Sequence, residues 1–155
     1  TLPFSFEITF IINSFKSVET GLFKYKNSNL MFNCWLENNY LFVKMMLNDK
    51  MAILQYLLTE TPEFENTLFI IGEYAKYDKF IISTILNNNI QEFPITVYKR
   101  DFLFDTDSVS SSSIEFSYIA TSANTNFFGI QAVRVWKKAL SIIEMLYYEF
   151  HNISL

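Results

Sequence analysis

Residues 30–47 read LMFNCWLENNYLFVKMML, and this stretch decides the expected fold. Two runs rich in aromatic and aliphatic side chains, 30–36 and 40–47, flank the polar triplet ENN, which has the composition of a tight turn. A third run with alternating polarity, 22–26, precedes them across a second polar cluster, NSN. Three short apolar runs separated by turns of about three residues predict an antiparallel meander.

Further strands are predicted on both sides of this meander. At residues 4–10, apolar side chains alternate with Ser, Glu and Thr, which is the pattern of a half-buried strand. Residues 77–86 fit a strand or a helix, and their β-branched content favours a strand. The remaining strand candidates are 67–71, 95–104 and 114–121, with a serine-rich exposed loop expected at 105–113.

Two segments carry helical patterns. In residues 130–150, seven large apolar side chains recur at steps of three and four, which predicts a long amphipathic helix with Trp136 at its centre. These positions are Ile130, Val133, Trp136, Leu140, Ile143, Tyr147 and Phe150. Residues 50–59, which follow the cap candidates Asn48 and Asp49, predict a short helix. Its expected buried positions are Ile53, Leu54, Leu57 and Leu58.

The order of these elements predicts an α+β domain. It contains an antiparallel sheet or partly open barrel of seven to eight strands, a short central helix, and a long C-terminal amphipathic helix that covers the open end. The chain of 155 residues has the length of one domain, with residues 1–19 as an additional N-terminal strand and 20–150 as the core.

Four segments together resemble a pleckstrin-homology-type domain, a bent seven-stranded barrel with one end covered by a C-terminal helix. They are GLFKYK at 21–26, FNCWLENNYLFV at 32–43, FSYIA at 116–120 and WKKAL at 136–140. Members of this family that bind phosphoinositides use a basic cluster in and after the first two strands. Lys24 and Lys26 match part of that cluster. Asn33 and Cys34 stand where further basic residues would be needed, so phosphoinositide binding is not expected.

The composition argues against several kinds of chemistry. A single cysteine, Cys34, and a single histidine near the C-terminus, His151, argue against Ser-His-Asp or Cys-His catalysis and supply no zinc ligand set. Three glycines are too few for a glycine-rich phosphate loop. A formal net charge of −4 argues against nucleic acid as a partner. We therefore expect no enzyme activity, no cofactor and no bound metal.

Aromatic side chains are abundant in this sequence, which contains 17 Phe, nine Tyr and two Trp. An excess beyond the needs of the core predicts aromatic surface, which indicates a protein partner or self-association. The leading hypothesis is a non-catalytic protein–protein interaction domain. Its partner would bind an aromatic sheet face or the outer side of the C-terminal helix. The candidate partner-binding residues are Tyr25, Tyr98, Phe102, Arg134, Lys138 and Tyr148.

Two other functions stay open on the sequence alone. The size and the acidic balance also fit a small immunity or inhibitor protein that neutralises a basic toxin or nuclease. Glu63 and Glu65 leave a carboxylate-based enzyme as the least favoured alternative, because nothing beside them supplies a nucleophile or an electrophile. No apolar run reaches the roughly 18–20 residues of a transmembrane helix, and a cytoplasmic location is expected.

Overall fold

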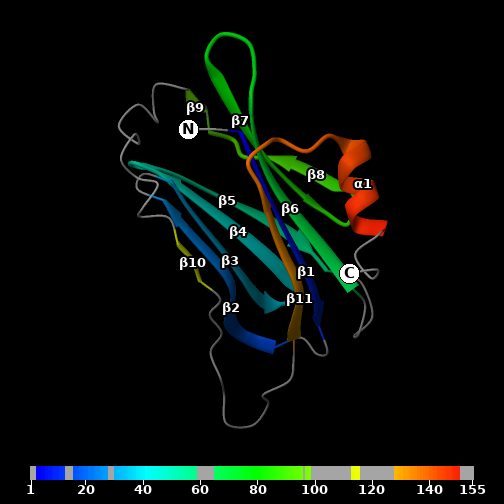
Figure 1. Ribbon diagram of the computed structural model, residues 1–155. Helices are drawn as coiled ribbons and strands as arrows, with labels where there is room; N and C mark the ends of the chain where they lie inside the picture. Colours follow the sequence, from blue (N-terminus) through cyan, green and yellow to red (C-terminus); the bar gives the residue numbers. More distant parts are fainter. Residues whose placement is uncertain are drawn as a thin grey trace.

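Two antiparallel sheets face each other and enclose the main hydrophobic core (Figure 1). This computed structural model describes residues 3–12, 16–27, 30–58, 65–95, 97–98, 113–115 and 128–150. Within these residues it contains eleven strands and one helix. They are β1 (Phe4–Ile12), β2 (Lys16–Asn27), β3 (Leu30–Asn38), β4 (Tyr40–Leu47), β5 (Lys50–Leu57), β6 (Glu65–Tyr74), β7 (Lys79–Leu86), β8 (Asn89–Glu92), β9 (Val97–Tyr98), β10 (Ser113–Glu115), β11 (Phe128–Trp136) and α1 (Ile142–Phe150).

The two sheets, called sheet A and sheet B, differ in how the chain builds them. Sheet B has the strand order β10-β2-β3-β4-β5, so consecutive strands form the predicted meander, and this prediction is confirmed. Sheet A has the order β11-β1-β6-β7-β8, with β9 paired to β7, and it joins segments from both ends of the described chain. The N-terminal strand, expected as an addition to the core, lies between β11 and β6.

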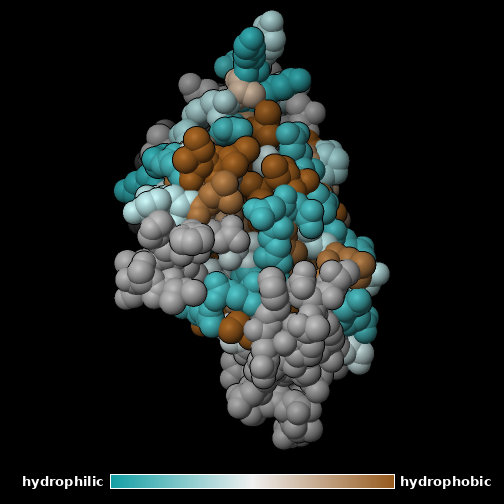
Figure 2. Space-filling model, turned by 90° about the vertical axis from the view of Figure 1, so that its right-hand side faces the viewer, coloured by the Kyte–Doolittle hydropathy of each residue, from teal (hydrophilic) through white to brown (hydrophobic). Residues whose placement is uncertain are grey.

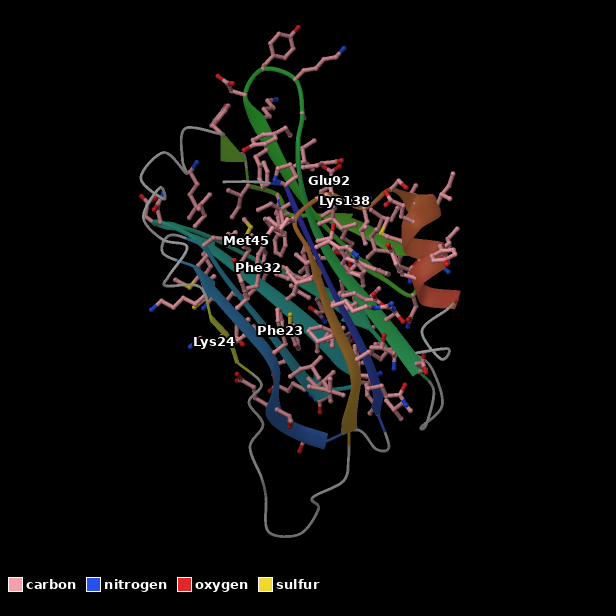
Figure 3. All side chains as sticks on the ribbon, viewed as in Figure 1. Phe23, Lys24, Phe32, Met45, Glu92 and Lys138 are labelled. Atoms are coloured by element: carbon pink, nitrogen blue, oxygen red, sulfur yellow. The ribbon has the colours of Figure 1, made fainter. Side chains whose placement is uncertain are left out.

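The alternation of side chains along β3 and β4 builds the core. Cross-strand pairing places Cys34 opposite Val43 and Phe32 opposite Met45, and all four side chains are fully buried. Figure 3 shows Phe23, Phe32 and Met45 between the two sheets. Because the side-chain period of a strand is two, the alternate positions of β3 and β4 face away from the core and are mostly half-buried.

Strand β1 is buried on both faces, which differs from the half-buried strand predicted at 4–10. Its apolar side chains belong to the core between the sheets, whereas Ser5, Glu7 and Thr9 are buried on the outer face of sheet A. The segment before α1 approaches that face, and Ser5 Oγ donates a hydrogen bond to the Lys138 carbonyl oxygen at 2.8 Å. The polar side of this strand is therefore covered by protein.

Asparagines shape the tight turns between the strands. Asn38 and Asn48 occupy the left-handed region of the backbone, each with a φ of 54°. Asn87 and Asn88 both lie there too, with φ of 48° and 72°, and they form the two-residue turn between β7 and β8. Asparagine tolerates this conformation better than most residues with a side chain, so these positions allow short hairpins.

The predicted short helix at 50–59 is wrong, because residues 50–57 form strand β5. Asn48 lies in a two-residue turn between β4 and β5, so it starts a hairpin and does not cap a helix. Leu54 is buried, whereas Ile53 and Leu57, both expected in the core, are 47% and 53% exposed. Pairing with β4 imposes the strand period and outweighs the helical spacing of the apolar residues.

The predicted long helix at 130–150 is also wrong, since the segment divides into a strand and a short helix. Residues Phe128–Trp136 form β11, which pairs with β1 along its length with one irregularity in register. The helix α1 covers nine residues, Ile142–Phe150. The apolar residues at helical spacing are therefore divided between β11 and α1. The first half of the segment forms a strand because the edge of β1 offers N–H and C=O groups for pairing.

The expected α+β barrel is corrected to a mostly β architecture of two separate sheets. No strand that the structure describes pairs across the two sheets, so they do not close into the barrel implied by the pleckstrin-homology resemblance. Side-chain packing across the core holds the sheets together instead. The helix lies against the outer face of sheet A and does not cover an open end (Figure 1).

Other predicted strands can be compared where the structure describes them. Segment 67–71 is confirmed as part of β6, and strand is the correct choice over helix for 77–86 except at its first two residues, because β7 begins at Lys79. The short strands β9 and β10 lie within or next to the segments predicted at 95–104 and 114–121. Residues 96, 99–112 and 116–121 of these segments and of the predicted loop lie outside the described residues.

Tyr56 joins the two sheets and gives a prediction for alkaline pH. Its hydroxyl donates a hydrogen bond to the Thr84 carbonyl oxygen at 2.9 Å, and burial raises the pKa of Tyr56 from 10.0 to about 12. The stabilisation is therefore fully present below pH 10 and is lost as the pH rises through 12. We expect Tyr56→Phe to reduce the fall in unfolding free energy over this window, measured by urea titration at several pH values. An equal fall in both proteins would contradict the prediction.

Candidate functional site

An apolar groove lies on the outer face of sheet A, between α1 and the turn that joins β7 to β8. Its volume is about 280 Å³. It is lined by Thr67, Phe69, Ile85, Asn87, Asn88, Ile90, Ile142, Met145 and Leu146. Pockets for small molecules usually have volumes of roughly 300–1,000 Å³, so this groove is at the lower limit and suits one or two side chains of a partner.

The polar part of the groove is built around the β7–β8 turn. The side-chain oxygen of Asn87 accepts a hydrogen bond from the Thr67 N–H at 2.9 Å, and its amide nitrogen donates to Asn66 Oδ1 at 2.8 Å. The Asn87 N–H also donates to the Thr67 carbonyl oxygen at 3.1 Å. These bonds fix the turn against the start of β6, so this wall of the groove is pre-formed.

The helix α1 turns an apolar side toward solvent next to this groove. Met145 and Tyr148 pack on sheet A in a second hydrophobic cluster, separate from the core between the sheets. The sequence pattern places Ile143 and Tyr147 on the buried side of the helix, which is wrong. The exposed fractions are 62% for Ile142, 80% for Ile143, 50% for Leu146 and 58% for Tyr147. Figure 2 shows hydrophobic surface gathered on this side of the molecule.

A charged and aromatic cluster holds α1 on the sheet. Arg134 on β11 lies opposite Glu7 on β1, and Arg134 Nη2 donates to Glu7 Oε1 at 2.8 Å. The same nitrogen donates to the carbonyl oxygen of Tyr148 at 3.0 Å, in the last turn of α1. The guanidinium carbon lies 5.7 Å and 5.4 Å from the ring centroids of Trp136 and Tyr148. One side chain therefore connects β1, β11 and α1.

Side chains also fix the segment between β11 and α1. Ser5 Oγ accepts a hydrogen bond from the Leu140 N–H at 2.9 Å. Ser141 and Glu144 form a capping box, in which each side chain accepts a hydrogen bond from the other residue's N–H at 3.2 Å. Lys138 and Glu144 form an exposed ion pair, which raises the pKa of Lys138 and lowers the pKa of Glu144. The start of α1 is thus specified locally.

Three of the six predicted partner-binding residues meet near α1. Arg134 and Tyr148 contact each other and are half-buried, so their described contacts hold the helix in place. Lys138 is exposed beside the start of α1, where Figure 3 places it. The three residues lie close to α1, and their part in binding stays a prediction.

The other three predicted residues lie elsewhere. Tyr25 packs against the core between the sheets, and its ring centroid is 4.6 Å from that of Phe6. Tyr98 is half-buried on β9, which pairs with the beginning of β7. Phe102 lies outside the described residues. The register of β2 decides the place of Tyr25, because Phe32 opposite it faces the core.

Sequence reasoning misses the groove itself, although two local signals point to its walls. The SIIE motif starting at Ser141 is a capping box and marks the true start of α1. The pair Asn87-Asn88 marks a two-residue hairpin turn after β7. Neither signal shows that the helix and the turn approach each other, because that depends on both elements packing on sheet A.

The outer face of sheet B is a second candidate surface, with side chains in rows across β2 to β5. Cross-strand pairing defines a Met row (Lys26, Met31, Met46, Met51), a Lys row (Lys24, Asn33, Lys44, Ile53), a Trp row (Gly21, Trp35, Phe42, Gln55) and a Glu row (Glu37, Tyr40, Leu57). The Trp35 and Phe42 rings stack with centroids 5.2 Å apart. Figure 3 shows Lys24 on the outer side of this sheet.

Metal binding and thiol reactivity each depend on particular side chains among the described residues. They bring together no group of three or more His, Cys, Asp or Glu side chains that could hold a metal ion. Burial raises the pKa of the Cys34 thiol far above its usual range, so this cysteine stays a neutral thiol at physiological pH.

Among the described residues, no helix has the length and apolar character needed to cross a membrane.

The fold defines a class: an antiparallel β-sandwich of two sheets with apolar side chains exposed on both outer faces. Solved structures with a similar fold are receptor-binding domains of botulinum neurotoxins. That of type G has a TM-score of 0.66 and 12% identity, covering 98% of this chain and 38% of that chain. The binding domain of type DC, in complex with rat synaptotagmin II, has a TM-score of 0.59 and 13% identity, covering 96% and 36%.

Another similar structure concerns botulinum neurotoxin type C, whose cell entry is dependent upon interaction with two ganglioside molecules. It has a TM-score of 0.58 and 12% identity, and the match covers 96% of this chain and 36% of that chain. The chain thus spans little more than a third of the length of these matched chains. At this level of identity the likeness shows a shared fold. No protein-family model and no curated protein matches the sequence.

Proposed function

We propose that this protein is a non-catalytic interaction domain that binds a protein partner through the outer side of α1 and the groove beside it. The observation that carries the proposal is the orientation of α1. Its side chains Ile142, Ile143, Leu146 and Tyr147 are at least half exposed, directly beside an apolar groove of about 280 Å³. Exposed apolar surface next to a concave site is typical of interaction surfaces.

The energetics of this surface suit binding. Burying a large aliphatic side chain contributes about 1.5–3 kcal/mol, so Ile143 and its neighbours can supply the anchors of an interface. The groove needs little reorganisation, because Asn87 fixes one wall and Arg134 holds the helix. A pre-formed site loses less conformational entropy when its partner binds.

The solved structures of similar fold agree with a binding role as the class of function. One contains rat synaptotagmin II, and another concerns dependence on two ganglioside molecules. Those partners belong to the neurotoxins. For this chain, a protein partner is proposed from the apolar character of α1 and of the groove.

The double variant Ile143→Asp/Leu146→Asp tests the proposal. We expect it to weaken partner binding by more than about tenfold, since two charged groups would be buried in the interface. A photo-crosslinking amino acid at Ile143 captures the partner, and biolayer interferometry with the purified partner measures the affinity of each variant.

Tyr77→Asp is the matched control, because Tyr77 is 88% exposed in the β6–β7 turn, away from α1. Its φ of 62° suits Asp. We expect this variant to bind as the unchanged protein does. If circular dichroism shows that the α1 double variant is folded and it binds the partner as tightly as the unchanged protein, the proposed site is refuted.

A further inference from the structure

Charges of opposite sign lie on the two sides of the Trp row on the outer face of sheet B. On one side lies the Lys row, where Lys24 and Lys44 flank Asn33. On the other side lies the Glu row with Glu37, on the same strand as Asn33. The Trp row between them carries the stacked rings of Trp35 and Phe42 and no charged residue. A row with two lysines and a row with one glutamate therefore lie at equal distances from an aromatic centre.

We propose that the domain forms a two-fold dimer in which the outer faces of sheet B pack against each other. The two-fold axis lies along the Trp row and crosses the strands. Such an axis places the Lys row of one copy opposite the Glu row of the other. Glu37 then faces Asn33 of the second copy and lies between Lys24 and Lys44, and this contact occurs twice because the interface is isologous.

The apolar side chains fit the same arrangement. Rotation about the Trp row brings Trp35 and Phe42 against their own copies, as offset aromatic contacts at the centre of the interface. It also brings Ile53 opposite Leu57, which are 47% and 53% exposed in the single chain. Aromatic anchors at the centre and charged groups around them form the usual layout of a protein interface.

Charge selects this axis over the other two-fold axis in the plane of the sheet. An axis parallel to the strands would keep each row opposite itself. It would place Lys24 opposite Ile53 and Lys44 opposite Asn33, and it would leave Glu37 opposite Tyr40. The charged groups would then be buried without ion pairs, which is costly.

The area of this face also suits a second copy. Four strands with a spacing of about 4.8 Å and a length of about seven residues give a flat footprint of roughly 450–500 Å². The relief of the side chains increases the accessible area above this value, toward the roughly 800 Å² that each partner buries in a standard interface. Two packed faces would lie about 10 Å apart, as sheets do in a sandwich.

Charge reversal tests the dimer. Sedimentation equilibrium of the unchanged protein should show a dimer. Lys44→Glu and Glu37→Lys should each raise the dimer dissociation constant by at least about tenfold, because like charges then lie side by side across the interface. The double variant Lys44→Glu/Glu37→Lys should dimerise more tightly than either single variant, because the new lysine then lies beside the new glutamate of the second copy, and Lys24 keeps it below the unchanged protein. Within one chain the two residues are about 13 Å apart along the strands, so this gain requires contact between copies.

Lys76→Glu is the matched control, since Lys76 is exposed in the β6–β7 turn, and it should leave the dimer unchanged.

A second measurement uses Gln55→Cys, because residue 55 faces its own copy across the axis. A short bismaleimide should cross-link this variant and not Lys76→Cys. A monomeric unchanged protein, a dimer insensitive to both reversals, or additive loss in the double variant would each overturn the proposal. Binding through α1 is measured separately with Ile143→Asp/Leu146→Asp, so either proposal can fail alone.

Discussion

Replacing Arg134 by alanine is expected to lower the free energy of unfolding by about 3–5 kcal/mol. Glu7 is 1% exposed, and its Oε1 receives a hydrogen bond from Arg134 at 2.8 Å. Without the guanidinium, the carboxylate would stay buried with no ion-pair partner. The substitution also removes the donor to the Tyr148 carbonyl oxygen, so α1 loses one of its contacts to the sheet. Urea denaturation at pH 7 measures the loss.

Two further variants separate the cost of breaking this pair from its net contribution. Glu7→Leu/Arg134→Met removes both charges and fills similar volumes, and we expect it to regain most of the lost stability. Lys137→Ala changes an exposed neighbouring residue and should alter stability by no more than about 0.5 kcal/mol. If Arg134→Ala costs less than about 1 kcal/mol, the carboxylate is solvated and Arg134 does not anchor the helix.

Phe32→Ala is expected to cost about 3–5 kcal/mol of unfolding free energy. The Phe32 side chain is fully buried on β3, and its ring centroid lies 5.9 Å from that of Phe4 and 6.2 Å from those of Phe6 and Phe93. Alanine would leave a cavity where rings from both sheets meet, and the strands can close it only in part. Thermal and urea unfolding report the effect.

Phe42→Ala provides the matched comparison, because Phe42 lies on β4 but faces away from the core and is half-buried. We expect a loss of less than half that of Phe32→Ala, measured at concentrations where the protein is monomeric. Similar losses for the two variants would contradict the assignment of the inner and outer faces of sheet B. Phe32→Leu, which keeps most of the volume, should cost less than the alanine variant.

Much of sheet B is predictable from local patterns. In residues 30–47, apolar alternation and the polar triplet ENN predict the β3–β4 hairpin, and the structure confirms it. The pattern works because the period of two and the turn chemistry of asparagine act within a few residues. The inward direction of Tyr25 depends on the pairing of β2 with β3, which contains two register shifts, so it could not be read from its own segment.

The candidate site was predicted only in part. The helix side that the sequence pattern turns outward, which includes Tyr148, packs on sheet A, and the side expected in the core is exposed. The capping box locates the start of α1, and binding through the outer side of this helix stays a prediction. The residues that form the groove come from β6, β7, β8 and α1, and no sequence pattern shows that these elements meet. Ile143 and Tyr147 look like core residues because they are large and apolar. The cytoplasmic location, the single-domain organisation and the inhibitor alternative stay predictions.

Two segments form strands where their sequence patterns predict helices. At 50–59 and 130–150, apolar residues at helical spacing also fit a strand that faces a core on one side. β4 and β1 offer these segments open edges with unpaired N–H and C=O groups, and pairing with them gives strands β5 and β11. The turns and the alternating strands follow from the order of residues, since their causes are local. Which face of α1 is buried follows from the packing of α1 on sheet A, because Arg134 on β11 holds the helix and Ser5, from the distant strand β1, fixes the segment before it.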